Sequence, residues 1–497
     1  MTRLLDLAPL LAVLASATAA VAIVFTGERR RNLRETWTVL ASLAKFGFIA
    51  AMVPGVLAGE RYQVVLAELA PGVSLALRAD PAGLLFALSA SFLWIVTSFF
   101  SIGYMRGAEE HKQTRFFAMM AVCLSATVGL ALAANLLTFV LFYEILSVAT
   151  YPLVIHKGSE KAYRIGRQYL VYAITAGIAL VAATALVYHT AGTLDFQGGG
   201  FLPAGADRGT LLVIFLLFFV GFGVKGGVMP LHSWLPNAMI APTPVSALLH
   251  AVAVVKAGVF GFVRLVGFVF GPDLTASIGG AGFLAGAAAV TIVLASFIAM
   301  TKDDLKARLA YSTVGHLSYV VLGVALLTPT AMLGGAFHIV THGAMKIMLF
   351  FCAGALYVHM HYTKVSELDG VGRRMPLTMG AFAVGALGLV GIPGTGGFVS
   401  KFMIAQGAAE SGQVLVLVLL VVSGLLNAGY LFPIAIRAFF RSSPEHTRYD
   451  EASWFMVGPI VVTAALAILL GTFPDALFGF FGIASQAVAS VAAGGVP

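Results

Sequence analysis

Long apolar runs separated by short polar segments make up most of this chain. A helix needs about 20 apolar residues to cross the roughly 30 Å hydrocarbon core of a bilayer, and about fourteen runs reach that length. They predict transmembrane helices near residues 5–26, 37–59, 83–104, 116–134, 135–156, 168–190, 211–232, 243–268, 276–300, 307–327, 330–357, 376–406, 411–436 and 453–474, with a shorter apolar tail near 477–494.

Within each run the apolar residues are continuous and do not alternate with polar ones. Alternation over about ten residues is typical of membrane β-barrel strands, and only helices and closed barrels satisfy their backbone hydrogen bonds in lipid. Only 10% of the 497 residues are charged, against about 25% in soluble domains. The sequence therefore predicts an all-α polytopic membrane protein, in which no loop is long enough to form a soluble catalytic domain.

Positively charged residues predict the orientation. Most of the 30 Lys and Arg residues lie in loops that follow odd-numbered runs, which the positive-inside rule assigns to the cytoplasm. Both termini are then extracytoplasmic, in the cell (inner) membrane. The net charge of +8 follows from this topology, so nucleic-acid binding is not predicted. The first run does not have the charge order of a signal peptide, because its arginines follow the run.

Five lysines and one acid, Glu144, lie inside predicted spans, where a charge costs at least ~2.5–3.5 kcal/mol. A single buried acid among several bases indicates pairing between them. Structural ion pairing is the alternative, but buried ion pairs stabilise less than apolar packing of similar volume. Lys45 is near enough to the cytoplasmic side to snorkel. The other four lysines are Lys225, Lys256, Lys346 and Lys401.

Glycine and proline interrupt the seventh and twelfth predicted spans close to two of these lysines. Lys225 lies within the Gly/Pro-rich segment 221–230, and Lys401 follows the similar segment 391–397. Non-helical backbone at membrane depth is tolerated only where protein or water surrounds it. Matched broken spans indicate an inverted-repeat transporter, and a simple proline kink with an incidental lysine is the alternative.

The two broken spans occupy equivalent places if spans four to eight and nine to thirteen form two repeats. Each is the fourth span of its unit, and because five is an odd number the units have opposite topology. The chain then divides into N-terminal helices 1–3 (1–114), a first five-helix repeat (115–270), a second, inverted five-helix repeat (271–440) and a C-terminal helix 14 with a tail (441–497).

The eleventh span carries His338, His342 and Lys346 at intervals of four residues. Successive members turn only about 40° around a helix, so all three share one face. Titratable groups at membrane depth can relay protons through intervening water. Histidines bonded to neighbouring carbonyls are the alternative.

Two further histidines are ambiguous. His250 and Lys256, in the eighth span, are six residues apart and therefore on different faces of a regular helix. A local bulge would realign them, but the sequence does not establish one. His316, in the tenth span, fits either a relay residue or a histidine with ordinary partners.

No cofactor or metal site is predicted. Cys123 and Cys352 lie in apolar runs without paired spacing, so neither a disulfide framework nor an iron–sulfur site is indicated. Haem ligation by buried histidines would require paired histidines on facing helices. Nothing resembles a nucleotide, flavin or hydrolytic site, so any oxidoreductase activity would belong to a larger complex.

One stretch carries a specific resemblance: Lys225-Gly-Gly-Val-Met-Pro-Leu-His-Ser-Trp-Leu-Pro-Asn-Ala-Met-Ile-Ala-Pro-Thr-Pro-Val-Ser-Ala-Leu-Leu-His250. It resembles the antiporter-like subunits of respiratory complex I, of Mrp-type multisubunit cation/proton antiporters and of membrane-bound hydrogenases. The continuation Lys256-Ala-Gly-Val-Phe, the segment His342-Gly-Ala-Met-Lys346 and the segment Phe142-Tyr143-Glu144 fit the same family. The resemblance covers roughly spans three to thirteen, and both the D-like and the A-like Mrp subunits are similar to this chain.

The resemblance implies a role for each buried charge. Glu144 and Lys225 are implied to be the interacting pair of a first half-channel, Lys256 a bridging lysine, and Lys401 the terminal residue of a second half-channel. It also implies other membrane subunits of an Mrp-type or complex I-like assembly as partners. The residues implied to lie on the central hydrophilic axis are His250, His338, His342 and Lys346.

Glu144 is expected to control the proton on Lys225. At a separation of roughly 7 Å and an effective dielectric constant near 20, their attraction is about 2.4 kcal/mol. That energy changes a proton-binding equilibrium more than tenfold. Protonation or displacement of Glu144 would therefore release a proton toward Lys256 and Lys401.

The alternatives to proton translocation are a haem-bearing redox subunit, a stand-alone carrier of organic solutes and a purely structural membrane subunit. A line of lysines across the centre favours protons over an organic substrate. Whether Na⁺ moves as well as H⁺, and whether the complex is an antiporter, an NADH-quinone oxidoreductase or a hydrogenase, are left open.

Overall fold

The computed structural model describes residues 5–444, 446 and 448–494. In this part of the chain, 12 helices are long and apolar enough to cross a membrane, and the prediction of a polytopic helical membrane protein is confirmed at that level. They are α2 (Ala8–Thr26), α3 (Arg31–Leu57), α4 (Pro81–Gly107), α5 (Gln113–Ala131), α6 (Leu136–Val154), α7 (Glu160–Ala191), α8 (Arg208–Gly226), the segment Thr243–Val269, α13 (Gly280–Thr301), α15 (Pro329–Met360), α19 (Val414–Phe440) and α20 (Trp454–Thr472).

Two predicted spans differ from these long apolar helices. The tenth is α14 (Leu305–Ala325), whose first turns carry Lys306 and Arg308. The twelfth consists of two 15-residue helices, α17 (Pro376–Val390) and α18 (Gly396–Glu410). A 15-residue helix is only about 22 Å long, less than the thickness of the hydrocarbon core. The shorter elements are α9 (Trp234–Asn237), η1 (Ala238–Ile240), α12 (Pro272–Ser277), η4 (Val365–Glu367), α16 (Val371–Arg374) and α21 (Phe480–Ala493).

A β-hairpin between α3 and α4 shows that the expectation of an all-α chain is wrong in one place. Strands β1 (Tyr62–Ala70) and β2 (Val73–Ala79) pair antiparallel around Gly72, whose φ of +73° suits glycine. The hairpin is joined to the bundle because Arg78 N donates to Leu132 O (2.7 Å) and Ala134 N to Ala76 O (3.0 Å). Each strand is too short to stand out against the surrounding apolar runs.

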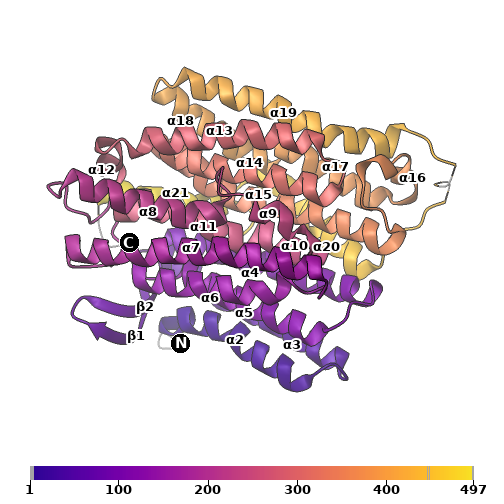
Figure 1. Cartoon of the computed structure of the whole chain (residues 1–497), viewed down its shortest axis with the longest axis horizontal. Coiled ribbons are helices and arrows are strands. Elements are labelled where there is room, and N and C mark those ends of the chain that lie inside the picture. The colour runs from indigo at the N-terminus through magenta and orange to yellow at the C-terminus, as the bar shows by residue number, and fades with distance from the viewer. Residues whose placement is uncertain (1–4, 445, 447, 495–497) are drawn as a thin grey trace.

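The helices run side by side between two ends of the bundle (Figure 1). We call the end with the loops 27–30, 108–112, 155–159, 302–304 and 361–375 the basic end. Hydrogen bonds join these loops, for example Arg115 Nη2 to His156 O (3.2 Å) and Ser366 N to Asp303 Oδ1 (3.0 Å). The opposite end holds β1, β2, α12 and α21, and we call it the hairpin end.

Helix α15 lies in the middle of the bundle (Figure 1), and nearly all of its residues from Ala331 to Leu356 are buried. Small residues let its neighbours approach closely. A Cβ at Gly334 would lie 2.7 Å from Ser400 O of α18, and a Cβ at Gly335 would lie 3.1 Å from Val320 O of α14. The polar residues of α15 therefore face other helices of the bundle and not lipid.

The eighth predicted span is an irregular helix made of α10 (Thr243–Ala247), the π-turn η2 (Leu248–Val252), α11 (Val254–Arg264) and the π-turn η3 (Leu265–Val269). Ala253 N donates to Leu248 O (3.0 Å), five residues back, which inserts one residue into the helical register. This is the bulge that the sequence did not establish. The π-turn contains His250 and ends four residues before Lys256.

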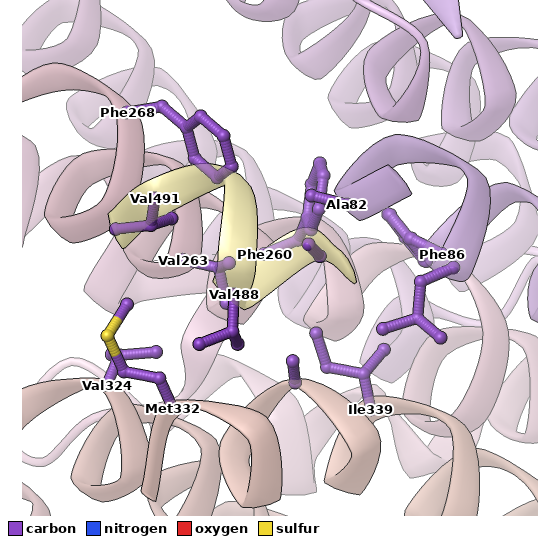
Figure 2. Close-up of a pocket in the computed structure, with 13 residues that line it drawn as sticks. Ala82, Phe86, Phe260, Val263, Phe268, Val324, Met332, Ile339, Val488 and Val491 are labelled. Carbon is purple, nitrogen blue, oxygen red and sulfur yellow. The ribbon is translucent and has the colours of Figure 1, made fainter. Parts of the chain in front are cut away.

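The N-terminal half of α4 and the C-terminal half of α11 are fastened at the hairpin end. Arg264 Nη2 forms a buried ion pair with Asp80 Oδ2 (2.8 Å), and Asp80 Oδ1 also accepts from Gly83 N (2.8 Å) at the start of α4. A small apolar gap of about 20 Å³ lies close by, lined by residues such as Phe86, Phe260 and Met332 (Figure 2). Its lining has no polar group to bind water.

Candidate functional site

Lys225 occupies the last turn of α8 and is 1% exposed. Its Nζ donates to the backbone carbonyl of Tyr143 on α6 (2.6 Å) and lies 3.4 Å from the centroid of the Tyr143 ring. The Tyr143 hydroxyl donates in return to Gly221 O of α8 (2.8 Å). The ammonium group is therefore held by a carbonyl and an aromatic face, both of which stabilise a cation.

Glu144 follows Tyr143 on α6, but its carboxylate turns toward α7. A Cβ at Gly177 would lie 2.8 Å from the carboxylate atoms, so this glycine makes room for them. Glu144 Oε1 is buried and has no hydrogen-bond partner among the described residues. Among the described residues, no ion pair joins Glu144 to Lys225 with a nitrogen–oxygen distance of 4.0 Å or less. The two charges therefore lie on either side of Tyr143 without direct contact.

Helix α11 crosses α8 directly beside Lys225. A Cβ at Gly258 would lie 2.2 Å from Gly226 N and 2.6 Å from the carbonyl carbon of Lys225, so only glycine fits there. Lys256, two residues earlier on α11, is buried, and its Nζ lies 2.7 Å from His342 Nδ1 of α15. The second lysine is thereby linked to the centre of the bundle.

Three buried imidazoles from α14 and α15 form a stack beyond Lys256. The His316 ring centroid lies 5.4 Å from that of His342 and 5.6 Å from that of His338. His316 Nδ1 and His338 Nε2 are 3.4 Å apart. His316 therefore bridges the two histidines of α15, which are one helical turn apart.

The stack ends at the first turn of α18. His338 Nδ1 lies 2.8 Å from Ser400 Oγ, which also accepts or donates to Thr341 Oγ1 at 3.2 Å. Lys401 follows Ser400 in the chain and is partly buried. Its Nζ donates to the carbonyls of Leu389 (2.5 Å) and Val390 (3.2 Å), the last two residues of α17.

The break between α17 and α18 thus supplies the partners of Lys401. The last carbonyls of a helix have no partner within the helix and carry the negative end of its dipole. The Tyr319 ring of α14 lies 4.6 Å from Lys401 Nζ and forms the other side of the site.

Lys346 belongs to a second line of hydrogen bonds. Its Nζ donates to Ser312 Oγ (2.7 Å), which lies 2.8 Å from the Tyr430 hydroxyl. Tyr430 donates to Asn427 Oδ1 (2.7 Å), and Asn427 Nδ2 donates to the Tyr319 hydroxyl (3.3 Å). Tyr319 is the ring beside Lys401, so this line and the histidine stack converge on the same lysine.

His250 is the one predicted site residue that stands apart. It is buried on the π-turn η2, where its ring lies 4.8 Å from the Phe350 ring centroid. Neither of its ring nitrogens has a hydrogen-bond partner among the described residues. The structure therefore brings His338 and His342 together with Lys256, but joins His250 to none of them by a hydrogen bond.

Lys45 corrects one sequence-based expectation. The side chain does not snorkel, because Lys45 is fully buried and its Nζ donates to Leu124 O of α5 (2.7 Å). The Trp94 ring of α4 lies 5.2 Å away. The expectation is wrong because this face of α3 packs against other helices and does not face lipid.

Residues that the sequence did not single out complete these contacts. They are common polar types, so their spacing carries little signal. Only Tyr143, which precedes Glu144, and Ser400, which precedes Lys401, are next to a predicted site residue in the sequence. The full set is Tyr143, Ser312, Tyr319, Ser400, Asn427 and Tyr430.

Comparisons with known proteins agree with this architecture. A family model described as "NADH:quinone oxidoreductase/Mrp antiporter, TM" matches residues 133–427. The chain is 30% identical over 436 residues to NADH-quinone oxidoreductase subunit N of Desulforudis audaxviator (strain MP104C), covering 84% of this chain and 86% of that one. It is 28% identical over 407 residues to the D-type subunit of a Na(+)/H(+) antiporter from Alkalihalophilus pseudofirmus, covering 81% of each.

Other relatives are longer than the region they share with this chain. The match to Hydrogenase-4 component B of Escherichia coli (strain K12) is 30% identical and covers 80% of this chain but 62% of that protein. Among solved structures, a chain of the Mrp complex from Dietzia sp. DQ12-45-1b superposes with a TM-score of 0.84 at 21% identity, covering 99% of this chain and 100% of that one. At this identity the likeness shows the fold.

Proposed function

The chain belongs to the NADH:quinone oxidoreductase/Mrp antiporter transmembrane family, and from this premise we propose that it is a proton-translocating membrane subunit of a multisubunit complex. The observation that carries the proposal is the buried line of contacts from Lys256 through His342, His316 and His338 to Ser400 beside Lys401. Charged and titratable groups at membrane depth are costly and mark ion pathways in transporters.

The proposed cycle begins with Glu144 and Lys225. Lys225 holds its proton while Glu144 is charged, and it releases the proton when Glu144 moves or becomes protonated. The proton then passes to Lys256 across the contact between α8 and α11. Lys225 and Lys256 are not hydrogen-bonded to each other in the described structure, so we assign this step to a transient water.

The second part of the pathway runs through polar contacts between Lys256 and His342, His316 and His338, and His338 and Ser400, and through the stacked rings of His342 and His316. Each imidazole accepts a proton on one nitrogen and gives one up from the other, so the stack of His342, His316 and His338 can pass charge by small ring rotations. Lys401 is the proposed end of this line. Lys346 and His250 are proposed to influence the relay without carrying its proton, because neither connects two residues of the line from Lys256 to Lys401.

The proposed organisation follows the sequence-based division. It comprises about fourteen spans, with inverted five-helix repeats over 115–270 and 271–440 that contain the broken spans of Lys225 and Lys401. A lysine near the break of the fourth span in each unit supports this division, with Lys225 before its break and Lys401 after its break. The basic end is proposed to be cytoplasmic and the termini extracytoplasmic.

An external source must drive the cycle, since moving one charge against 100 mV needs ~2.3 kcal/mol. The similarity to a Na(+)/H(+) antiporter protein supports an opposing cation gradient, with other membrane subunits of an Mrp-type assembly as partners. The similarity to an NADH-quinone oxidoreductase protein supports the second candidate, in which redox chemistry in partner subunits drives the pump.

Inverted membrane vesicles containing the chain and its neighbouring subunits test the proposal. ΔpH formation is measured after adding NaCl, and separately after adding an electron donor, in wild type and in Lys225→Ala. Loss of transport of about 100-fold in the variant is expected, because a proton-transfer group contributes about that much or more.

Lys45→Met is the matched control, since Lys45 is also a buried lysine bonded to a carbonyl but lies outside the proposed pathway. Transport by Lys45→Met at the wild-type rate, with equal amounts of assembled protein, is expected. Wild-type transport by assembled Lys225→Ala would overturn the proposal. Dependence on NaCl or on the electron donor decides between the two candidates.

A further inference from the structure

Three side chains at the basic end lie together although they are far apart in the sequence. Glu110 and His111 belong to the loop between α4 and α5, and His156 lies two residues beyond the end of α6. His156 Nε2 is 3.8 Å and His111 Nδ1 is 4.0 Å from the same oxygen, Glu110 Oε2. One ligand atom from each of the three residues lies within 4.8 Å of the others.

Among the three residues, His156 gives the strongest indication of a bound ligand. Its side chain is 0% exposed, yet neither ring nitrogen has a hydrogen-bond partner among the described residues. Leaving a buried polar group unpaired costs about 1–3 kcal/mol, so such a group calls for an explanation. A neutral imidazole whose two nitrogens both lack a partner has a free lone pair with which to bind a metal ion.

We infer that Glu110, His111 and His156 form a binding site for a divalent transition metal of the Zn²⁺ type. Two imidazoles and one carboxylate are a ligand set that Zn²⁺ takes, with a water in the fourth position. Ligand atoms around tetrahedral Zn²⁺ are about 3.3 Å apart, given metal–ligand distances near 2.0–2.1 Å. A small rotation of the exposed His111 shortens the observed 4.0 Å distance, and a small rotation of the Glu110 side chain shortens the 3.8 Å distance to His156.

The loop that carries two of the ligands is held in place. Gln113 Nε2 donates to the backbone carbonyls of Glu110 (3.0 Å) and Met105 (3.0 Å), and Gln113 Oε1 accepts from Arg34 (2.7 Å). Because the backbone of Glu110 is fixed in this way, only side-chain movement is needed to bind the metal.

Positive charges near the three ligands disfavour cation binding, and the types of ligand determine which cation binds. Arg115 Nη2 donates to His156 O (3.2 Å), and Lys112 follows His111 in the chain. Glu110 supplies the one negative charge among the three ligands. A hard cation such as Mg²⁺, which needs oxygen ligands, is therefore disfavoured relative to Zn²⁺, which binds imidazole strongly.

The position of the site beside a cavity at the basic end would let a bound metal ion affect transport. His156 is followed by Lys157, which lines a cavity of about 190 Å³ together with Tyr104, Asp304 and Lys306. A bound dication would add positive charge beside this cavity and hinder the approach of protons or other cations from the basic end. This consequence rests on the proposed transport function, whereas the metal site itself does not.

Zn²⁺ titration of the purified, tag-free, EDTA-treated complex tests the site. Isothermal titration calorimetry and elemental analysis are compared for wild type, His156→Gln and Glu110→Gln. His189→Gln is the control, because His189 is an exposed histidine outside the cluster. One Zn²⁺ per chain is expected in wild type and in the control, with affinity at least about tenfold weaker in both cluster variants.

Equal Zn²⁺ affinity and stoichiometry in wild type and both cluster variants would overturn the inference, as would displacement by Mg²⁺ at similar concentrations. If one variant does not assemble, the other decides. Zn²⁺ inhibition of vesicle transport in wild type, relieved in Glu110→Gln, is the separate test of the consequence. Binding without inhibition would leave the site intact and remove only its link to transport.

Discussion

Lys225, which is buried, and Lys401, which is partly buried, both lie near a broken span, but they are held in different ways. Lys225 lies in the last turn of α8 and donates to the carbonyl of Tyr143 on α6, whose ring it also contacts. Lys401 lies in the second turn of α18 and donates to the last two carbonyls of α17, the other half of its own broken span. A carboxylate, Glu144, lies near the first lysine, whereas the second has Tyr319 and Asn427 in its surroundings.

This difference shows how a lysine beside a broken span can have two different roles. A charge that can be neutralised, as on Glu144, provides a switch whose state depends on its own protonation. Carbonyls at a helix end are permanent dipoles and cannot be neutralised. The first lysine is therefore suited to control, and the second to receiving and releasing a proton at a fixed affinity.

The largest effect is expected from removing the switch. Glu144→Gln keeps the shape of the side chain but not its charge, and transport should fall about 100-fold, as for loss of a proton-transfer group. Vesicle ΔpH measurements at equal protein levels provide the test. Transport within twofold of wild type would mean that Glu144 does not control proton release from Lys225, and that the two lysines do not differ in this respect.

Lys401→Ala is expected to have a smaller effect, a loss of about tenfold, which corresponds to 1.4 kcal/mol. The carbonyls of Leu389 and Val390 that hold the ammonium group remain in the variant, and a water bound to them can replace Lys401 in part. The initial rate of vesicle acidification measures the effect. A loss as complete as that of Glu144→Gln would show that nothing replaces Lys401.

Tyr319→Phe separates the ring from the hydroxyl. The ring stays beside Lys401, but the bonds to Ser423 (2.6 Å) and Asn427 (3.3 Å) are lost. Of these two bonds only the one to Asn427 belongs to the line that reaches Lys401, and its loss costs about 1 kcal/mol, so transport should fall about fivefold. The same rate measurement applies, and an unchanged rate would assign the hydroxyl network to stability alone.

Gly177→Ala should have the smallest effect. The added Cβ would meet the Glu144 carboxylate at 2.8 Å and push it to another rotamer at a cost of about 0.5–1.5 kcal/mol. A loss of transport of about threefold is expected. Gly282→Ala, which meets no atom within 4 Å, is the matched control. An equal effect of both variants would rule out a specific role for the position of Glu144.

Sequence alone predicted the helical membrane architecture well because the length of an apolar run directly reflects bilayer thickness. It also identified Lys225, Lys256 and Lys346 as buried, since charge in lipid is rare, but it missed the buried ion pair of Arg264 and Asp80. It missed the β-hairpin of β1 and β2, whose strands are short, and it misjudged Lys45, because the side of α3 that faces protein is not evident from hydropathy.

The connections among the site residues could not be predicted. They depend on which faces of α14, α15 and α18 meet, and on small residues such as Gly334 and Gly335 that set the distances between these helices. The π-turn at residues 248–252 is equally hidden, since no residue type in Leu248–Val252 requires it. The cluster of Glu110, His111 and His156 was missed for the same reason, because its members come together only in three dimensions.

The backbone contact between Gly258 and Gly226 has a kinetic consequence. Because the two helices already touch at this point, they cannot approach further, and separating them would open a void at the centre of the bundle. We therefore expect the Cα atoms of Lys225 and Lys256 to keep nearly the same separation during turnover. Under the proposed cycle, the step between them is timed by side-chain rotation and water diffusion, which take picoseconds to nanoseconds, and not by helix movements of microseconds to milliseconds.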